Sequence, residues 1–115
     1  MPYYRVDFRH TTEGVQNLVS MPIVRREAAT KAIESVGGRL LDLWYSFGKE
    51  DGFATVEAPD NEAVVAAVLK INAAAGVEAW TTPLITPEEF YEALKRASKV
   101  KYQAPKAKRR QAPKR

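Results

Sequence analysis

Three charged side chains near the N-terminus have the types and the spacing to bind a ligand. Arg5, Asp7 and Arg9 alternate with apolar residues, which predicts a strand over residues 3–10 with the three charges on one face. Guanidinium groups can fix an anion through charge-assisted hydrogen bonds, and the carboxylate can take part in its proton transfer. The alternative is structural, because a buried charge needs a partner: Asp7 pairs with the arginines, or they reach Glu57.

The single histidine, His10, closes this strand. Its imidazole is a candidate general base or haem ligand, and Asp7 and Glu57 are the other acid–base candidates. The alternative is a surface histidine near the start of a helix. A structural zinc site needs several histidine or cysteine ligands, and this chain has one histidine and no cysteine. We therefore expect no metal and no cofactor.

Large aromatic residues stand on the later predicted strands. Trp44, Tyr45, Phe53 and Trp80 can line a pocket for a planar ligand, or they can fill a core and an interface between copies. The parity of the second strand is open, so Tyr45 can take the place of Trp44 in such a pocket. The predicted ligand-binding set is Arg5, Asp7, Arg9, Trp44, Phe53 and Glu57.

The elements that must position these residues follow a regular order. Alternation predicts strands over 3–10, 39–47, 53–58 and 77–85, and helical spacing predicts helices between them, with Pro22 dividing the first helical region. A last helix, to about residue 97, is expected to bury Phe90, Leu94 and Ala97. The order is typical of an α+β, ferredoxin-like βαββαβ sandwich with an additional C-terminal helix. Right-handed crossovers place the strands in the spatial order fourth, first, third, second.

The second strand is apolar on both sides. Simple alternation puts Leu41, Leu43, Tyr45 and Phe47 on one side and Leu40, Asp42, Trp44 and Ser46 on the other. One layer of helices cannot cover both sides, and a bare face with such residues would be a large exposed apolar patch. We therefore expect a homodimer in which two sheets pair face to face.

The turn of the predicted hairpin carries Gly48 and Asp51. Glycine can supply a positive φ there, and aspartate can accept hydrogen bonds from turn amides. We interpret both residues as turn formers.

The chain resembles the GYD-domain family of small bacterial proteins over roughly residues 3–97. The resemblance rests on four stretches, which are residues 25–28, 38–51, 59–63 and 81–89. Gly48 and Asp51 match the glycine and aspartate of the family's turn, whereas Glu50 stands at the tyrosine position, so no role of that tyrosine carries over. The family is similar to dimeric α/β-barrel proteins, and the resemblance implies this fold rather than a reaction.

Charge divides the chain into two predicted segments. Residues 99–115 hold 8 of the 18 basic residues and no acid, whereas residues 1–98 hold 10 basic and 14 acidic residues. We predict a ferredoxin-like domain over 1–98 and a basic, disordered tail rich in proline, lysine and arginine over 99–115. The tail, Lys99 to Arg115, predicts weak, non-specific contact with nucleic acid, or it is only a solubilising extension.

These features predict a small homodimeric module that binds a small ligand, anionic if the arginines hold it, in the cleft between two sheets. One alternative is a cofactor-independent enzyme of the monooxygenase or isomerase type, and another is a tether to polyanions through the tail. Whether the protein catalyses a reaction stays open. The lack of cysteine, of a leader-like N-terminus and of a long apolar run predicts a cytoplasmic protein with no membrane contact.

Overall fold

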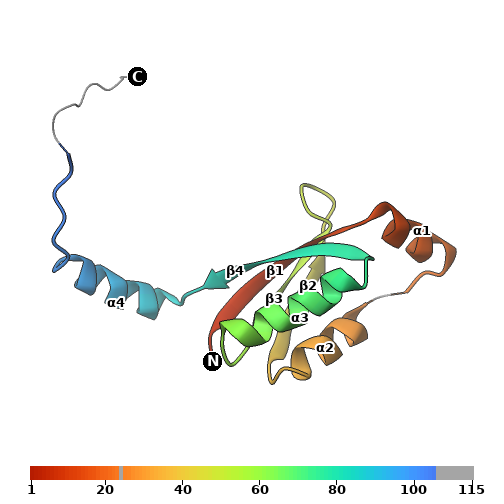
Figure 1. Cartoon of the computed structure of the whole chain (residues 1–115), viewed down its shortest axis with the longest axis horizontal. Coiled ribbons are helices and arrows are strands. Elements are labelled where there is room, and N and C mark those ends of the chain that lie inside the picture. Colours follow the sequence, from red (N-terminus) through yellow and green to blue (C-terminus); the bar gives the residue numbers. More distant parts are fainter. Residues whose placement is uncertain (24, 106–115) are drawn as a thin grey trace. The chain divides into compact units, whose positions relative to one another are not determined.

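The computed structural model describes residues 1–23 and 25–105. In chain order its elements are β1 (Tyr3–His10), α1 (Thr12–Ser20), α2 (Arg26–Glu34), β2 (Arg39–Tyr45), β3 (Gly52–Glu57), α3 (Asn61–Ala73), β4 (Val77–Leu84) and α4 (Pro87–Ala97) (Figure 1). The described residues fall into two units, residues 1–85 and residues 86–105.

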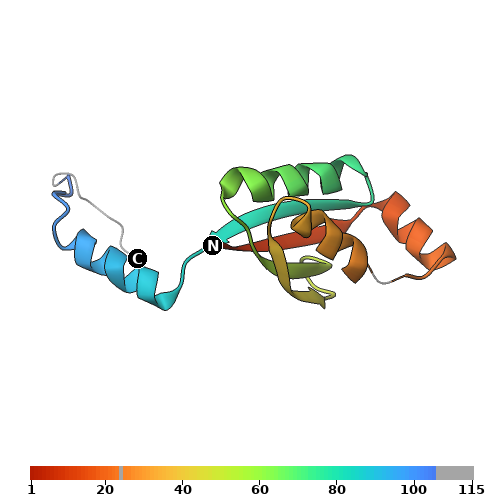
Figure 2. The ribbon, with the colours of Figure 1, turned by 90° about the horizontal axis from the view of Figure 1, so that it is seen from below.

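The first unit is built on a four-stranded antiparallel sheet with the order β2-β3-β1-β4. Two helices, α2 and α3, lie side by side on one face of this sheet (Figure 1), and α3 runs along β4 (Figure 2). The predicted α+β, ferredoxin-like fold and its strand order are confirmed. The pairing of two such sheets into a barrel stays a prediction.

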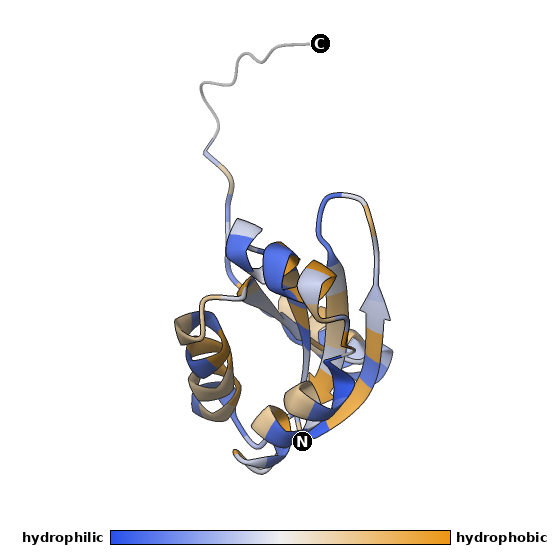
Figure 3. Cartoon of the chain, turned by 90° about the vertical axis from the view of Figure 1, so that its right-hand side faces the viewer, coloured by the Kyte–Doolittle hydropathy of each residue, from blue (hydrophilic) through white to orange (hydrophobic). Residues whose placement is uncertain are grey.

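The core lies between the sheet and these two helices. Alternation along the strands sends every second side chain to this covered face, and Figure 3 shows the resulting bands of hydrophilic and hydrophobic residues. The buried apolar residues are Tyr4, Val6, Ile33, Ala54, Val56, Ala58, Val64, Ala67 and Val68.

A β-bulge in β2 corrects the simple alternation expected there. Leu40 pairs with Val56 and Asp42 pairs with Thr55, so Leu41 is an extra residue without a partner on β3. The bulge shifts the pattern by one residue. Leu40 and Leu43 therefore share the covered face, against the prediction that they lie on opposite sides. Trp44 lies opposite Phe53, on the other face.

The helix starts follow from side-chain caps that satisfy backbone N–H groups. Asp60 accepts a hydrogen bond from the Ala63 amide at the start of α3 (2.9 Å). Thr86 and Glu89 form a reciprocal capping box at the start of α4. At the start of α1, Gly14 approaches the Gly76 carbonyl so closely that a Cβ on Gly14 would lie 2.1 Å from its oxygen. The joint between β1 and α1 is thereby fixed against the turn that precedes β4.

The second unit contains α4. Its apolar residues Phe90 and Leu94 are exposed, and the helix has no buried residue. The prediction that α4 buries Phe90, Leu94 and Ala97 is therefore wrong for this chain. Six of the eight basic residues of the predicted tail fall within 106–115, outside the described residues.

None of the helices in the described parts of the chain is long and apolar enough to cross a membrane.

Candidate functional site

All six residues of the predicted ligand-binding set lie on the face of the sheet opposite α2 and α3, which we call the open face. Odd-numbered residues of β1 point there, and strand register places their partners beside them. One row across the sheet runs through Trp44, Phe53, Asp7 and Trp80. The next row toward the start of β1 runs through Asp42, Thr55, Arg5 and Thr82.

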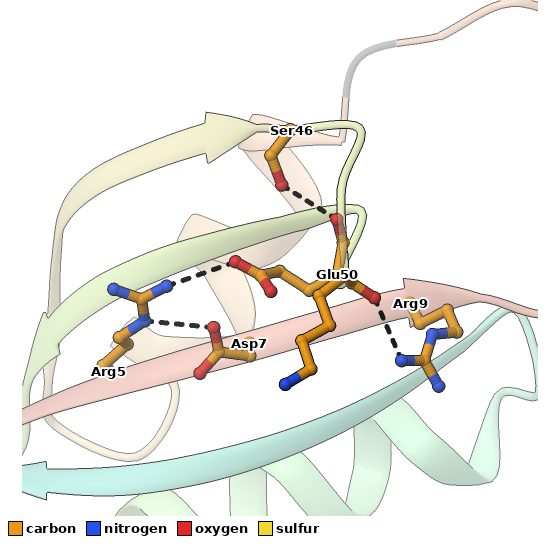
Figure 4. A network of polar contacts seen from close by, with 6 residues as sticks. Arg5, Asp7, Arg9, Ser46 and Glu50 are labelled. Carbon is orange, nitrogen blue, oxygen red and sulfur yellow. Dashed lines mark hydrogen bonds and ion pairs between the residues drawn. The ribbon is translucent and has the colours of Figure 1, made fainter.

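Arg5 and Asp7 form the centre of this face. Asp7 is the only charged residue described as buried, with 7% of its surface exposed. Arg5 Nε donates to Asp7 Oδ1 over 3.0 Å (Figure 4). A buried carboxylate needs such a partner. The structural alternative predicted that Asp7 pairs with an arginine, and this is found for Arg5.

The Arg5 guanidinium makes two further contacts. Its Nη2 donates to Glu50 Oε2 over 3.3 Å, and its Cζ lies 4.0 Å from the centre of the Phe53 ring (Figure 4). The planar guanidinium thus stacks on an aromatic ring while its edge faces two carboxylates. Glu50 occupies the position where the GYD turn has tyrosine, and it was absent from the predicted set.

Arg9 contacts the hairpin turn and Trp80. Its Nη2 donates to the Lys49 carbonyl over 3.0 Å (Figure 4), and its Cζ lies 5.6 Å from the Trp80 ring. The hairpin turn between β2 and β3 therefore folds over the end of the row formed by Arg5, Asp7 and Arg9. Trp80 is a neighbour of the site that the predicted set missed, although its register with Asp7 could be inferred by pairing the first and fourth strands.

Glu57 lies on the same face but does not join the central pair. It accepts a hydrogen bond from Arg39 over 2.8 Å. Its register partner is Tyr3, four residues from Asp7, which corresponds to roughly 13 Å along a strand. The idea that Arg5 or Arg9 reaches Glu57 is wrong, because Arg39 takes that place.

His10 lies on the covered face, with 14% of its side chain exposed. The surface-histidine alternative is therefore wrong. Its ring stacks with Tyr45 at 6.4 Å between centres and 12° between planes. His10, Asp7 and Glu57, the three acid–base candidates, are consequently not brought together in one site.

Gly48 and Asp51, the residues that match the family's turn, do not have the roles expected of simple turn formers. Gly48 has no positive φ, and a Cβ there would meet nothing within 4 Å, so the expected need for a positive φ is wrong. Asp51 Oδ2 accepts a hydrogen bond from the His10 amide over 2.8 Å and lies 3.5 Å from His10 Nδ1. Asp51 thus ties the hairpin to β1 rather than only bonding within the turn.

Within the residues that the structure describes, no group of three or more histidine and acidic side chains could hold a metal ion. The open face carries cations, carboxylates and aromatic rings.

Comparisons with known proteins place the chain in a family. No curated protein matches it. Among solved structures, the crystal structure of MtbAldR matches with a TM-score of 0.54 and 19% identity over 74% of this chain, which spans 53% of that protein's chain. At this identity the likeness shows the fold alone. The sequence model of the GYD domain matches residues 4–94, more than half of the chain, and this protein belongs to the GYD-domain family.

Proposed function

We propose that this domain is a homodimeric module that binds a small ligand in the cleft between the open faces of two copies. One observation carries the proposal. Trp44 and Trp80, with 60% and 41% of their surfaces exposed, flank the buried Asp7 and its partner Arg5 in the middle of the open face. Aromatic residues and arginine are the types enriched where proteins associate.

The occupant that suits this face is a second copy of the same chain. The face carries both signs of charge, with Arg5, Arg9 and Arg39 beside Asp42, Glu57 and Glu78. In a two-fold dimer the same patch meets itself, so a patch with both signs can place arginine against carboxylate. A patch of one sign would repel its copy.

The ligand proposal rests on the remaining capacity of Arg5. Within the described part of the chain, its Nε and Nη2 donate to Asp7 and Glu50, which leaves the N–H groups of Nη1 for an anionic or polar group. Phe53 already stacks on the guanidinium, and Trp44 lies opposite Phe53 on β2. A planar ligand between the sheets would have an aromatic wall and a cation at its edge.

The dimer is tested by light scattering on the purified full chain at micromolar concentration. We expect a mass of about twice 12.9 kDa. A monomer at these concentrations would overturn the face-to-face arrangement.

The ligand site is tested by incubating the protein with a metabolite extract and identifying retained molecules by mass spectrometry. We expect a stoichiometric molecule on the wild type and on Arg39→Ala, which changes a more distant cation of the same face. Arg5→Ala should lose it while the domain stays folded. A molecule retained equally by Arg5→Ala, or none at all, would contradict a site at Arg5.

The charge of residues 99–115 supports a second candidate function, a tether to nucleic acid or another polyanion. Eight basic residues without an acid would bind phosphates by counterion release, with dissociation constants of about 10⁻⁴–10⁻⁶ M at physiological salt. We expect this binding to fall steeply with added salt and to disappear from a chain that ends at Ser98. Binding that survives the truncation would place it in the domain.

A further inference from the structure

A cavity lies on the covered face of the sheet, on the side opposite Arg5, Asp7 and Arg9. This cavity of about 150 Å³, partly open to solvent, lies between the sheet and the two helices that pack on it. Its walls include Ala29 and Ile33 of α2, Val68 and Ile71 of α3, and Leu43 and Ala54 of the sheet. The lining is apolar except at three residues, His10, Arg25 and Tyr45.

Small residues explain why this part of the core is hollow. Ala28 and Ala29 face the cavity from α2, and Ala54 and Ala79 face it from the sheet. Protein interiors otherwise pack as densely as organic crystals. Once α2 and the sheet are packed together, these four alanines leave a space that leucine or isoleucine would fill.

At the polar end of the cavity, Asp51 and Tyr45 hold the imidazole of His10 in place. Asp51 lies 3.5 Å from His10 Nδ1 and accepts the His10 backbone N–H over 2.8 Å, and the imidazole stacks on Tyr45. A carboxylate beside Nδ1 favours the tautomer with its proton on that nitrogen. The other nitrogen, Nε2, is then a hydrogen-bond acceptor on a residue that lines the cavity.

We propose that this cavity binds a single-ring aromatic alcohol of the phenol class, whose hydroxyl donates to His10 Nε2. The size fits one ring, because an apolar protein cavity of about 150 Å³ can hold benzene. The chemistry fits one donor, because the wall is apolar apart from His10, Arg25 and Tyr45, and the imidazole of His10 offers an acceptor. Asp51 is a positioning residue here, since it acts through His10. This site is independent of the open face and of dimer formation.

The experiment compares phenol with toluene, which has nearly the same shape but a methyl group in place of the hydroxyl. Binding of each probe to the full chain is titrated by NMR. We expect both to shift resonances of cavity residues such as Ile33 and Val68. Failure of phenol to shift these resonances, or shifts confined to the open face around Arg5, would overturn the proposal.

The variant His10→Phe keeps an aromatic ring beside Tyr45 and removes the acceptor. We expect the ratio of phenol to toluene affinity to fall about fivefold, the effect of one neutral hydrogen bond. An unchanged ratio would show that His10 does not receive the hydroxyl. Because the ratio is taken within each variant, a general change in stability does not imitate this result.

Asp51 has a spectroscopic test that needs no ligand. Nitrogen-15 spectra of the imidazole distinguish the two tautomers, and we expect the proton on Nδ1 in the wild type. Asp51→Asn replaces an acceptor with an amide that can donate, so the Nε2–H form should grow and the phenol-to-toluene ratio should fall. The same tautomer in both proteins would contradict the positioning role.

Filling the cavity provides the final control. Ala29→Leu should abolish binding of both probes, whereas Ala66→Leu, at an exposed position of α3, should leave both unchanged. Thermal unfolding establishes that each variant is folded, and Ala28→Leu replaces Ala29→Leu if the latter is not. Probe binding that survives a folded, filled variant would show that the probes bind elsewhere.

Discussion

Tyr3 and Tyr4 are neighbours of the same type, yet they belong to different parts of the molecule. Tyr4 is 2% exposed on the covered face, where its hydroxyl donates to Asn61 over 2.7 Å, whereas Tyr3 is 37% exposed on the open face. The difference arises because successive side chains of a strand point to opposite faces of its sheet. One strand, β1, therefore supplies residues both to the core and to the polar open face.

The two faces of the sheet carry different kinds of residues. The covered face is filled by aliphatic residues from α2 and α3 and keeps a ring-sized cavity. The open face carries paired charges, such as Arg5 with Asp7 and Arg39 with Glu57, next to exposed tryptophans. Substitutions on the first face should act on folding, and substitutions on the second should act on association and binding.

The largest difference is expected between the two tyrosines. Tyr4→Ala should lower the free energy of unfolding by about 3–5 kcal/mol, the usual cost of truncating a buried aromatic residue. Tyr3→Ala should cost less than about 1 kcal/mol. Urea denaturation at one protein concentration measures both. Tyr4→Phe, which loses only the bond to Asn61, should fall between them, and equal losses at positions 3 and 4 would show that the faces do not differ.

Trp44→Ser tests the open face as a dimer interface. A tryptophan that acts as an interface hot spot is typically worth about 2 kcal/mol or more, so the dimer dissociation constant should rise by about 30-fold or more. Analytical ultracentrifugation measures it. Phe47→Ser is the matched control, since Phe47 is a fully exposed aromatic residue in the hairpin rather than on the sheet. An equal effect of both substitutions would contradict the proposed interface.

Arg5→Ala tests whether the buried carboxylate depends on its partner. Removing the guanidinium leaves Asp7 buried without its hydrogen bond, which should destabilise the domain by about 1–3 kcal/mol. Arg39→Ala, on a more exposed pair, should cost under about 1 kcal/mol. The double variant Arg5→Ala/Asp7→Ala should be more stable than the sum of the single changes predicts, and simple additivity would show that the pair is not coupled.

Deleting Leu41 tests the bulge that sets the parity of β2. The remaining residues can then pair without an extra one, so the deletion should cost about 1 kcal/mol and leave Trp44 opposite Phe53. Deleting Leu43 instead should damage folding, because it takes a residue from the covered face. Thermal unfolding of the two variants compares them, and a greater loss from the Leu41 deletion would contradict the assigned register.

Truncation after Ser98 should have the smallest effect on folding. Residues 99–105 form no helix or strand, so the free energy of unfolding should change by less than about 0.5 kcal/mol. Chemical denaturation of the shortened chain checks this. A larger loss would show that residues after Ser98 contribute to the folded domain.

The sequence by itself determined the order of the elements and the two faces of β1. Alternation in residues 3–10 predicted that Arg5 and Asp7 lie on one face of the strand and Val6 on the other. Thr86 and Glu89 predicted the start of α4. These signals are local, since caps and strand alternation depend on residues only a few positions apart. The resemblance to the GYD-domain family added a fold that the pattern already favoured.

Only the tertiary structure decided which residues meet across the chain. The bulge at Leu41 set the parity of β2, and the hairpin carried Glu50 to Arg5 and Asp51 to His10. Contacts 41 and 45 residues apart depend on strand register and on how a turn folds over its neighbour, which neither periodicity nor residue type encodes locally. The cavity has the same origin, because its alanines leave a space only once α2 and the sheet are packed together.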